Sequence, residues 1–324
     1  MPSWGQILSE TNNLMAGGNT NAPNVVRQKY LKALSEFTGR DTIVYASRWT
    51  AGGIDPNLIS ITDEDLQGFL EAAQSLTTGK LDLILHTGGG QAEAADAIVS
   101  FLRQTFDNIR VIIPQAAMSA GTMIACAAEE IVMSKHSFIG PIDPQFIIQS
   151  SGMLQAVPAH AILEQFAKAQ LEIKEDPKAA GSWIPILPQY GPALLVQCQN
   201  QIEFGKNLIK NWLDLYMFKG EGGETADKIA NYLSDHSNFK THSKHINNID
   251  AKTLGLKTID LESNAGLQEA ALSAFHAVMI NFNFGAVKII CNQKGNIFVK
   301  NQQMLVPFQQ AIPPQQLPQP FRPR

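Results

Sequence analysis

The sequence has little cysteine, and the few cysteines it has are far apart. Its 324 residues include three, Cys126, Cys198 and Cys291, each among apolar neighbours. An odd number of widely spaced cysteines predicts neither a disulfide framework nor a zinc site. We therefore expect reduced thiols in the core of a cytoplasmic protein.

Runs of positive charge and long apolar stretches are also missing. The chain has 25 Lys and Arg against 29 Asp and Glu, a formal net charge of -4, and no basic run that could follow a phosphate backbone. No segment approaches the roughly 18 apolar residues of a membrane span, and the amino terminus lacks the pattern of a signal peptide. We expect neither nucleic acid nor a membrane as a partner.

What the sequence does contain is an alternation of apolar strands and helices. Strands are predicted at 42–47, 81–85, 110–114 and 130–133, and helices at 92–105 and 122–128. Continuous apolar strands indicate a mainly parallel sheet that is covered by helices on both faces. The pattern therefore predicts an α/β fold.

The later part of the chain is predicted to be mostly helical before the sheet pattern returns. Helical patterns occur at 153–173, 192–218 and 224–236. We interpret residues 153–236, approximately, as a helical insertion into a main domain of residues 41–300. Residues 1–40 are predicted to form a helical arm, and the Gln- and Pro-rich residues 301–324 a disordered tail.

A serine lies at the corner between the strand at 110–114 and the helix that follows. Ser119 belongs to the small-residue turn MSAGT at 118–122. A hydroxyl at such a corner stands clear of the sheet, beside helix N–H groups that have no intrahelical partner. We take Ser119 as the candidate nucleophile.

A glycine-rich loop leaves the neighbouring strand at the same edge of the sheet. Its sequence is Thr87-Gly88-Gly89-Gly90. Gly89 in this loop and Ala120, directly after the serine, are candidate N–H donors to an oxyanion, a contribution of roughly 3 kcal/mol per donor. The loop lacks the lysine of a P-loop and the spacing of a dinucleotide fingerprint, which argues against a phosphate site.

A nucleophilic serine needs a base, and the chain has seven histidines. His242 and His245 lie in a loop before a predicted short helix and strand, where catalytic side chains are often found. His86 ends the strand before the glycine loop, whereas His136 and His160 have no evident orienting context. Position in the chain leaves the identity of the base open.

Four motifs occur in a fixed order along the chain. They are ILHTGGG at 84–90, MSAGT at 118–122, IGPIDPQ at 139–145, and Thr241-His242 before the segment 249–256. Together they resemble the Clp-fold serine peptidases over roughly Thr42 to Leu261. Within that superfamily, which includes the Clp proteolytic subunit and signal peptide peptidase A, they are most similar to the serine dehydrogenase proteinase family. The resemblance implies a Clp/crotonase-type α/β fold of stacked ββα units with a helical insertion.

The same resemblance implies an activity and a set of catalytic residues. Ser119 would attack a peptide carbonyl, His242 would accept and return the proton, and Asp143 would hold the imidazolium. The implied protein is a cytoplasmic serine endopeptidase that acts on polypeptide through an acyl-enzyme. It needs no metal or organic cofactor, and it assembles as a homo-oligomer.

Several alternatives stay open at this point. His245 is a second candidate base, and Lys174 would give a serine–lysine dyad of the kind that signal peptide peptidase A uses. Asp143 lies in Ile-Asp-Pro, which is also a turn-forming unit. A crotonase-like acyl-CoA enzyme would use the oxyanion site without a nucleophile. A non-catalytic scaffold would have the fold without a working active site.

Overall fold

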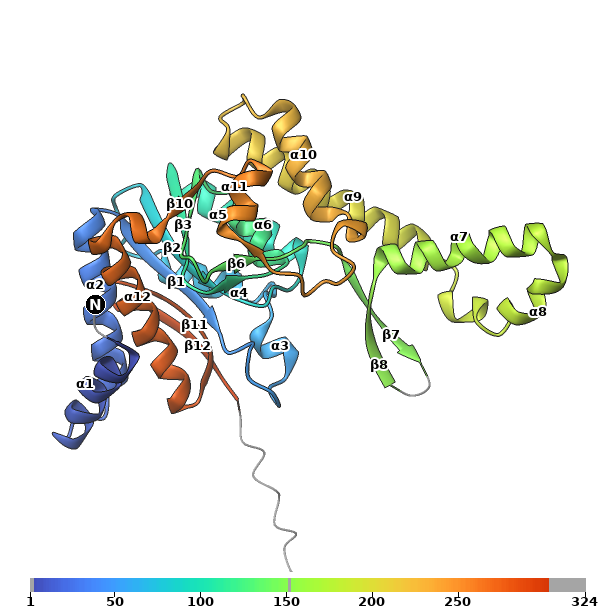
Figure 1. Cartoon of the computed structure of the whole chain (residues 1–324). Helices are drawn as coiled ribbons and strands as arrows, with labels where there is room; N and C mark the ends of the chain where they lie inside the picture. Colours follow the sequence, from blue (N-terminus) through green and yellow to red (C-terminus); the bar gives the residue numbers. More distant parts are fainter. Residues whose placement is uncertain (1–2, 151–152, 303–324) are drawn as a thin grey trace, which may run out of the picture.

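A seven-stranded sheet forms the centre of the protein (Figure 1). The computed structural model describes residues 3–150 and 153–302, so that most of the tail predicted to be disordered lies outside the described residues. In spatial order the strands are β10 (Thr258–Asp260), β5 (Glu130–Met133), β3 (Asn108–Ile113), β2 (Lys80–His86), β1 (Asp41–Ser47), β11 (Ala286–Asn292) and β12 (Ile297–Asn301).

The direction of the strands follows the sequence pattern. The five strands from β10 to β1 are parallel to one another. The hairpin of β11 and β12 extends the sheet in antiparallel fashion beyond β1. The expected α/β fold is therefore confirmed, with a mainly parallel sheet.

Helices cover both faces of this sheet, and two of them, α7 and α8, project away from it (Figure 1). They are α1 (Trp4–Ala16), α2 (Ala22–Thr38), α3 (Pro56–Ile59), α4 (Asp65–Ala72), α5 (Ala92–Thr105), α6 (Ala120–Cys126), α7 (Ala159–Glu175), α8 (Ala180–Trp183), α9 (Leu194–Trp212), α10 (Gly223–Ser234), α11 (Asn248–Leu254) and α12 (Ala265–Asn281). Successive side chains of a strand point to opposite faces. Thus Leu83 and Leu85 of β2 join a core with α5, α6, α9 and α10, whereas Ile84 joins one with α2 and α12.

The region predicted as a helical insertion begins differently from the prediction. Residues Met153–Pro158 form strand β8, which pairs with β7 (Gln145–Ser150), and α7 starts only at Ala159. Proline disfavours the helical conformation of the residue before it, so Val157 stays extended and the helix begins after Pro158. In Figure 1 this hairpin projects from the body together with α7 and α8, and α9 leads the chain back to the body. None of the helices in residues 3–150 and 153–302 has the length and apolarity that crossing a membrane requires.

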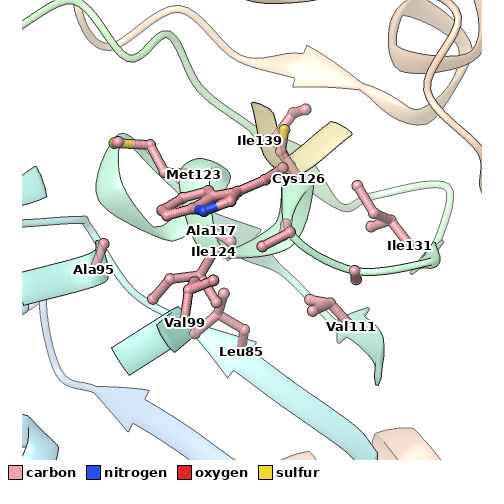
Figure 2. Close-up of a cluster of buried hydrophobic side chains, with 14 of the residues drawn as sticks. Leu85, Ala95, Val99, Val111, Ala117, Met123, Ile124, Cys126, Ile131 and Ile139 are labelled. Carbon is pink, nitrogen blue, oxygen red and sulfur yellow. The ribbon is translucent and has the colours of Figure 1, made fainter. Parts of the chain in front are cut away.

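Helix α6, which follows Ser119, is embedded in the core. All seven of its residues are buried, and Ile124 lies in one cluster with Leu85 of β2 and Val99 of α5 (Figure 2). A Cβ on Gly121 would come within 2.5 Å of Thr87 Cγ2, so glycine permits the close approach of this helix to the glycine-rich loop. The nucleophile candidate is thus attached to a helix whose residues are all packed in the core.

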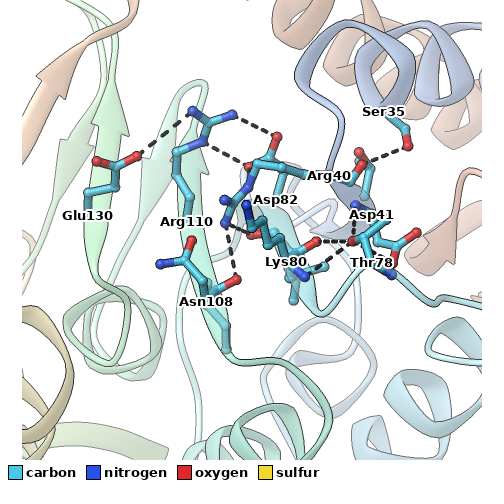
Figure 3. A network of polar contacts seen from close by, with 12 residues as sticks. Ser35, Arg40, Asp41, Thr78, Lys80, Asp82, Asn108, Arg110 and Glu130 are labelled. Carbon is cyan, nitrogen blue, oxygen red and sulfur yellow. Dashed lines mark hydrogen bonds and ion pairs between the residues drawn. The ribbon is translucent and has the colours of Figure 1, made fainter.

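A polar network fixes the amino-terminal ends of the central strands. Asp82 of β2 is fully buried and accepts two hydrogen bonds from Arg110 of β3, each 2.8 Å long. It also forms a 2.7 Å ion pair with Arg40, just before β1 (Figure 3). Asp82 and Arg110 are register partners in the sheet, so the network fixes the register of β2 and β3. The opposite, carboxyl-terminal edge carries the glycine-rich loop and Ser119.

Candidate active site

A small three-stranded sheet brings distant segments of the chain to one place. Its strands are β4 (Ala116–Ala117), β6 (Phe138–Ile139) and β9 (Ile246–Asn247). Strands β4 and β6 are parallel, and β9 is antiparallel to β6. The residues that follow β4 and β6 and those that precede β9 therefore leave the same end of this sheet. These segments carry Ser119, Asp143 and His242 respectively.

Ser119 adopts a strained backbone conformation at the start of α6. Its φ and ψ angles are 51° and −119°, a region that side-chain-bearing residues rarely occupy. Such a conformation costs on the order of 1–3 kcal/mol and persists only where the surroundings impose it. Here β4 and the buried α6 fix the chain on both sides of the residue. The result is a half-buried serine at a sharp strand-to-helix turn.

Asp143 accepts a hydrogen bond from each of two histidines. His242 Nδ1 lies 2.8 Å from Asp143 Oδ1, and His236 Nδ1 lies 2.9 Å from Asp143 Oδ2. The aspartate side chain is fully buried, whereas the side chain of His242 is 23% exposed and that of His236 is 14% exposed. The sequence interpretation did not consider His236. The signal in the sequence was its position six residues before His242, at the end of a predicted helix.

Ser119 and His242 line one cleft of about 590 Å³. Gly89 forms part of the same wall, and Met123, Ile142 and Phe146 supply apolar surface. Asp143 lies next to Ile142, whose N–H donates to the Leu233 carbonyl of α10. The arrangement is a hydroxyl and an imidazole that face one space, with a buried carboxylate behind the imidazole.

The glycine-rich loop lies against the Ser119 turn. Thr87 N donates to Ala116 O, and Met118 N donates to Thr87 O, so the loop pairs with β4. Ala120 is the first residue of α6, and its N–H has no acceptor within the helix. The Gly89 N–H donates to Thr87 Oγ1 over 3.1 Å in this structure. Of the two oxyanion donors that the sequence suggested, Ala120 has an N–H without a helical acceptor, whereas Gly89 lines the cleft.

We expect Gly89→Ala to inactivate the site without unfolding the protein. Gly89 has φ = 101°, and a Cβ there would lie 2.6 Å from Ser119 Cβ and 2.7 Å from Met118 O. A displacement of about 1 Å can lower a rate about 100-fold, so the reaction of Ser119 with a fluorophosphonate should slow by at least that factor. Gly53→Ala is the matched control, because Gly53 has φ = 77° but no atom within 4 Å of the added Cβ. Equal losses in both variants would mean that backbone strain, and not contact with Ser119, causes the effect.

The structure does not bring the two alternative bases into the cleft. His245 is exposed, and its ring stacks on Phe138 with 3.7 Å between centroids. Lys174 is an exposed residue in the last turn of α7, on the projecting part of the molecule (Figure 1). Neither is among the described residues that line the cleft around Ser119.

His86 is buried below the glycine-rich loop and does not act as a base for Ser119. Its ring packs against Trp49 and Phe275, and within the described part of the chain neither ring nitrogen has a hydrogen-bond partner. Burial lowers the pKa of His86 from 6.5 to about 4. The imidazole is therefore neutral at physiological pH and packs in the core as an apolar group does.

This burial predicts a pH dependence of stability. Between pH 6.5 and about 4 the unfolded chain binds a proton at His86 that the folded protein does not bind. The free energy of unfolding should therefore decrease by about 3 kcal/mol as the pH falls through this range, at about 1.4 kcal/mol per pH unit. His86→Phe should remove this part of the decrease, as measured by urea denaturation at several pH values. The control His245→Gln, at an exposed position, should leave it in place; an unchanged slope in His86→Phe would contradict the assignment.

The described residues include no group of three or more His, Cys, Asp or Glu side chains that could together hold a metal ion. Behind the cleft lies an aspartate that is hydrogen-bonded to two histidines, and of these three residues His242 alone lines the cleft. The chemistry available there is nucleophilic attack by a hydroxyl with proton transfer to an imidazole.

Comparison with known proteins identifies relatives of the chain. Two are proteins of Methanocaldococcus jannaschii. Uncharacterized protein MJ0137 is 33% identical over 243 residues, which is 74% of this chain and 74% of the relative. Uncharacterized protein MJ1495 is 32% identical over 198 residues, which is 61% of this chain and 58% of the relative, less than two thirds of its length.

Among solved structures the similarities are distant. A mutant of the 1510-N membrane-bound stomatin-specific protease has 16% identity and a TM-score of 0.36, over 63% of this chain and 77% of that one. A mutant of ClpP1 from Listeria monocytogenes has 15% identity and a TM-score of 0.33, over 72% of this chain and 98% of that one.

The family model described as ClpP-like SDH-type serine proteinase matches residues 25–264. The match covers most of the chain, including all four sequence motifs and the segments that carry Ser119, Asp143 and His242. The resemblance to this family is thereby confirmed: the chain belongs to the ClpP-like SDH-type serine proteinases.

Proposed function

We propose that this protein is a serine endopeptidase in which Ser119, His242 and Asp143 form the catalytic triad. The observation that carries the proposal is the hydrogen bond between His242 Nδ1 and Asp143, together with the cleft that His242 and Ser119 both line. Membership of a serine proteinase family supports the same reaction class.

In the proposed reaction, Ser119 Oγ attacks the carbonyl carbon of a peptide bond. His242 holds its Nδ1 proton toward Asp143, which leaves Nε2 free to accept the serine proton. When the tetrahedral intermediate collapses, the imidazolium gives this proton to the leaving amine, and the acyl group stays on Ser119. A water molecule then releases the acyl group by the same steps, with His242 again as the base.

The negative charge on the carbonyl oxygen needs donors close to Ser119. We assign the Ala120 N–H as the first donor, because it directly follows the nucleophile and has no helical acceptor. The Gly89 N–H is the second, and it has to exchange its bond with Thr87 Oγ1 for one with the oxyanion. Each such donor contributes roughly 3 kcal/mol to the transition state.

The fit of the cleft to a polypeptide supports the choice of substrate. The cleft borders strand β7, and Phe146 and Ile147 of this strand contribute to its lining, with Ile147 66% exposed. With Met123 and Ile142 they make a surface suited to apolar side chains of an extended or unfolded chain.

Labelling with a fluorophosphonate tests the proposal directly. The reagent phosphonylates an activated serine and loses fluoride, so we expect one adduct per chain in the intact mass and its location at Ser119 by peptide mapping. An active peptidase also cleaves fluorescein-labelled casein, and the adduct should stop that cleavage. A folded protein that neither reacts nor cleaves would favour the inactive scaffold.

We further propose that the protein assembles with copies of itself in the cytoplasm. The projecting helices expose large apolar side chains, with exposed fractions of 57% at Leu171, 61% at Ile184 and 64% at Val196. Apolar surface of this kind favours association. The three free, buried cysteines fit a reducing compartment. Sedimentation velocity of the full chain tests the assembly, and a monomer at all concentrations would contradict it.

A further inference from the structure

We propose that His236 is a positioning residue of this active site. His236 shares Asp143 with the catalytic base, His242, and fixes the direction of the Asp143 carboxylate. This inference rests on the proposed peptidase function. It starts from the geometry of Asp143, whose two oxygens each accept one imidazole N–H, Oδ1 from His242 and Oδ2 from His236.

The two hydrogen bonds together remove the rotational freedom of the carboxylate. An aspartate held by one partner can turn about its last side-chain bond, because that torsion is broad. With both oxygens bound at 2.8 and 2.9 Å, the plane of the Asp143 carboxylate is defined by the two rings. His236 therefore acts on His242 only through Asp143. It is not among the described residues that line the substrate cleft.

The chain around His236 is built to hold this ring in place. His236 begins a short helical turn, His236–Asn238, whose preceding residue Asp235 accepts the Ser237 N–H. Phe239 is buried and packs edge-on against Tyr232 of α10, with 5.1 Å between centroids. The segment is thus fastened to the same helix whose Leu233 carbonyl binds the Ile142 N–H beside Asp143.

The hydrogen bonds also fix the tautomers of the two rings. A carboxylate has only acceptor atoms, so in the proposed arrangement both histidines direct Nδ1–H toward it. For His242 this leaves Nε2 available to the Ser119 proton.

Other charged groups face this segment, and they bear on the design of the test. Asp235 precedes His236, and Lys240 follows it by one turn. His160 of α7 contacts the Ser234 carbonyl through Nε2 over 3.1 Å. The Ser237 hydroxyl and N–H hold the pKa of Asp235 below its usual value, aided by His160 and Lys240. None of these groups is changed in the variants below.

Two substitutions separate the hydrogen bond from the shape of the ring. His236→Asn places an amide N–H near the position of Nδ1 and keeps a donor without a titrating group. His236→Phe keeps a planar ring and removes the donor. We expect the Phe variant to lose about tenfold in kcat on a fluorogenic peptide, the scale at which lost outer hydrogen bonds lower activity. KM should stay unchanged, and the Asn variant should remain within about twofold of the wild-type protein.

The pH profile of kcat/KM distinguishes positioning from a structural role. Without the second donor the carboxylate is held by His242 alone and can turn, so the profile of His236→Phe should differ from that of the wild-type protein and that of His236→Asn much less. The inference is overturned if the two variants lose equal activity, or if the loss follows a fall in Tm with an unchanged pH profile.

A spectroscopic readout keeps this inference separate from the proposed function. In the proton NMR spectrum of the full-length Ser119→Ala protein, we expect two downfield imidazole N–H signals, from His236 and His242. His236→Phe in this background should remove one signal and shift the other. If the remaining signal does not shift, the two rings do not share Asp143. If the wild-type protein has no peptidase activity but the signals behave as expected, the proposed function fails while the shared carboxylate stands.

Discussion

Ser119→Ala should lower kcat for peptide hydrolysis by about a millionfold, the largest single effect that we expect in this protein. The change removes the only atom that can form the acyl-enzyme in the proposed mechanism. In a well-studied serine peptidase, loss of the nucleophile costs about as much as loss of the whole triad, because its members act as one unit. The residual rate then comes from substrate binding and the oxyanion donors.

The stability of the variant should be unchanged, since alanine at φ = 51° is no more strained than serine. Kinetics on fluorescein-labelled casein and fluorophosphonate labelling measure the loss, and thermal unfolding verifies the fold. Ser60→Ala is the matched control, because Ser60 is the other serine among the described residues that line the cleft. If Ser119→Ala retained casein cleavage and Ser60→Ala lost it, the nucleophile would be misassigned.

The fold was predictable from the sequence because its central strands are mostly apolar, with charged residues such as Asp82 toward their amino-terminal ends. Strands such as β2, buried on both faces, are typical of a parallel sheet with helices on each side. The strained turn at Ser119 was also marked by its small residues, since only Gly121 lets α6 approach Thr87. Local chemistry determines these features, so a local pattern reveals them.

The partners of Asp143 were harder to predict, because they depend on contacts between distant parts of the chain. His236 lies 93 residues from Asp143 in sequence, and its closeness to His242 is the one local sign of that contact. The family resemblance indicated His242 alone. Only the pairing of β6 with β9 and the attachment of α10 to Ile142 bring both histidines to one carboxylate.

The predicted start of the helical insertion was wrong for a more local reason. Residues 153–158 have the composition of a helix, but they pair with β7 in an antiparallel hairpin. Pro158 marked the boundary, and its effect on the residue before it should have outweighed the apolar spacing. The consequence for function is direct, because the hairpin places strand β7 beside the cleft.

His242→Ala should abolish peptide hydrolysis almost as completely as loss of the serine, with kcat reduced by about a millionfold. Asp143→Asn should reduce kcat by about 10⁴-fold, because the amide donates to His242 Nδ1 and so favours the tautomer whose Nε2 already carries a proton. Casein cleavage and single-turnover acylation measure both effects. Because Asp143 also binds His236, thermal unfolding is needed to separate catalytic loss from destabilisation in that variant.

Matched variants at the alternative bases decide between the triad and its rivals. His245→Ala and Lys174→Ala should keep wild-type activity, since His245 stacks on Phe138 outside the cleft and Lys174 is exposed at the end of α7. If Lys174→Ala abolished cleavage while His242→Ala did not, the reaction would use a serine–lysine dyad, with the lysine supplied from the projecting helices of a neighbouring copy. In that case, mixing Ser119→Ala protein with Lys174→Ala protein would restore activity. In the triad mechanism, a mixture of Ser119→Ala and His242→Ala proteins stays inactive, because Ser119 and His242 line the cleft of the same chain. The mixing experiment therefore tests which chain supplies the base as well as which residue it is.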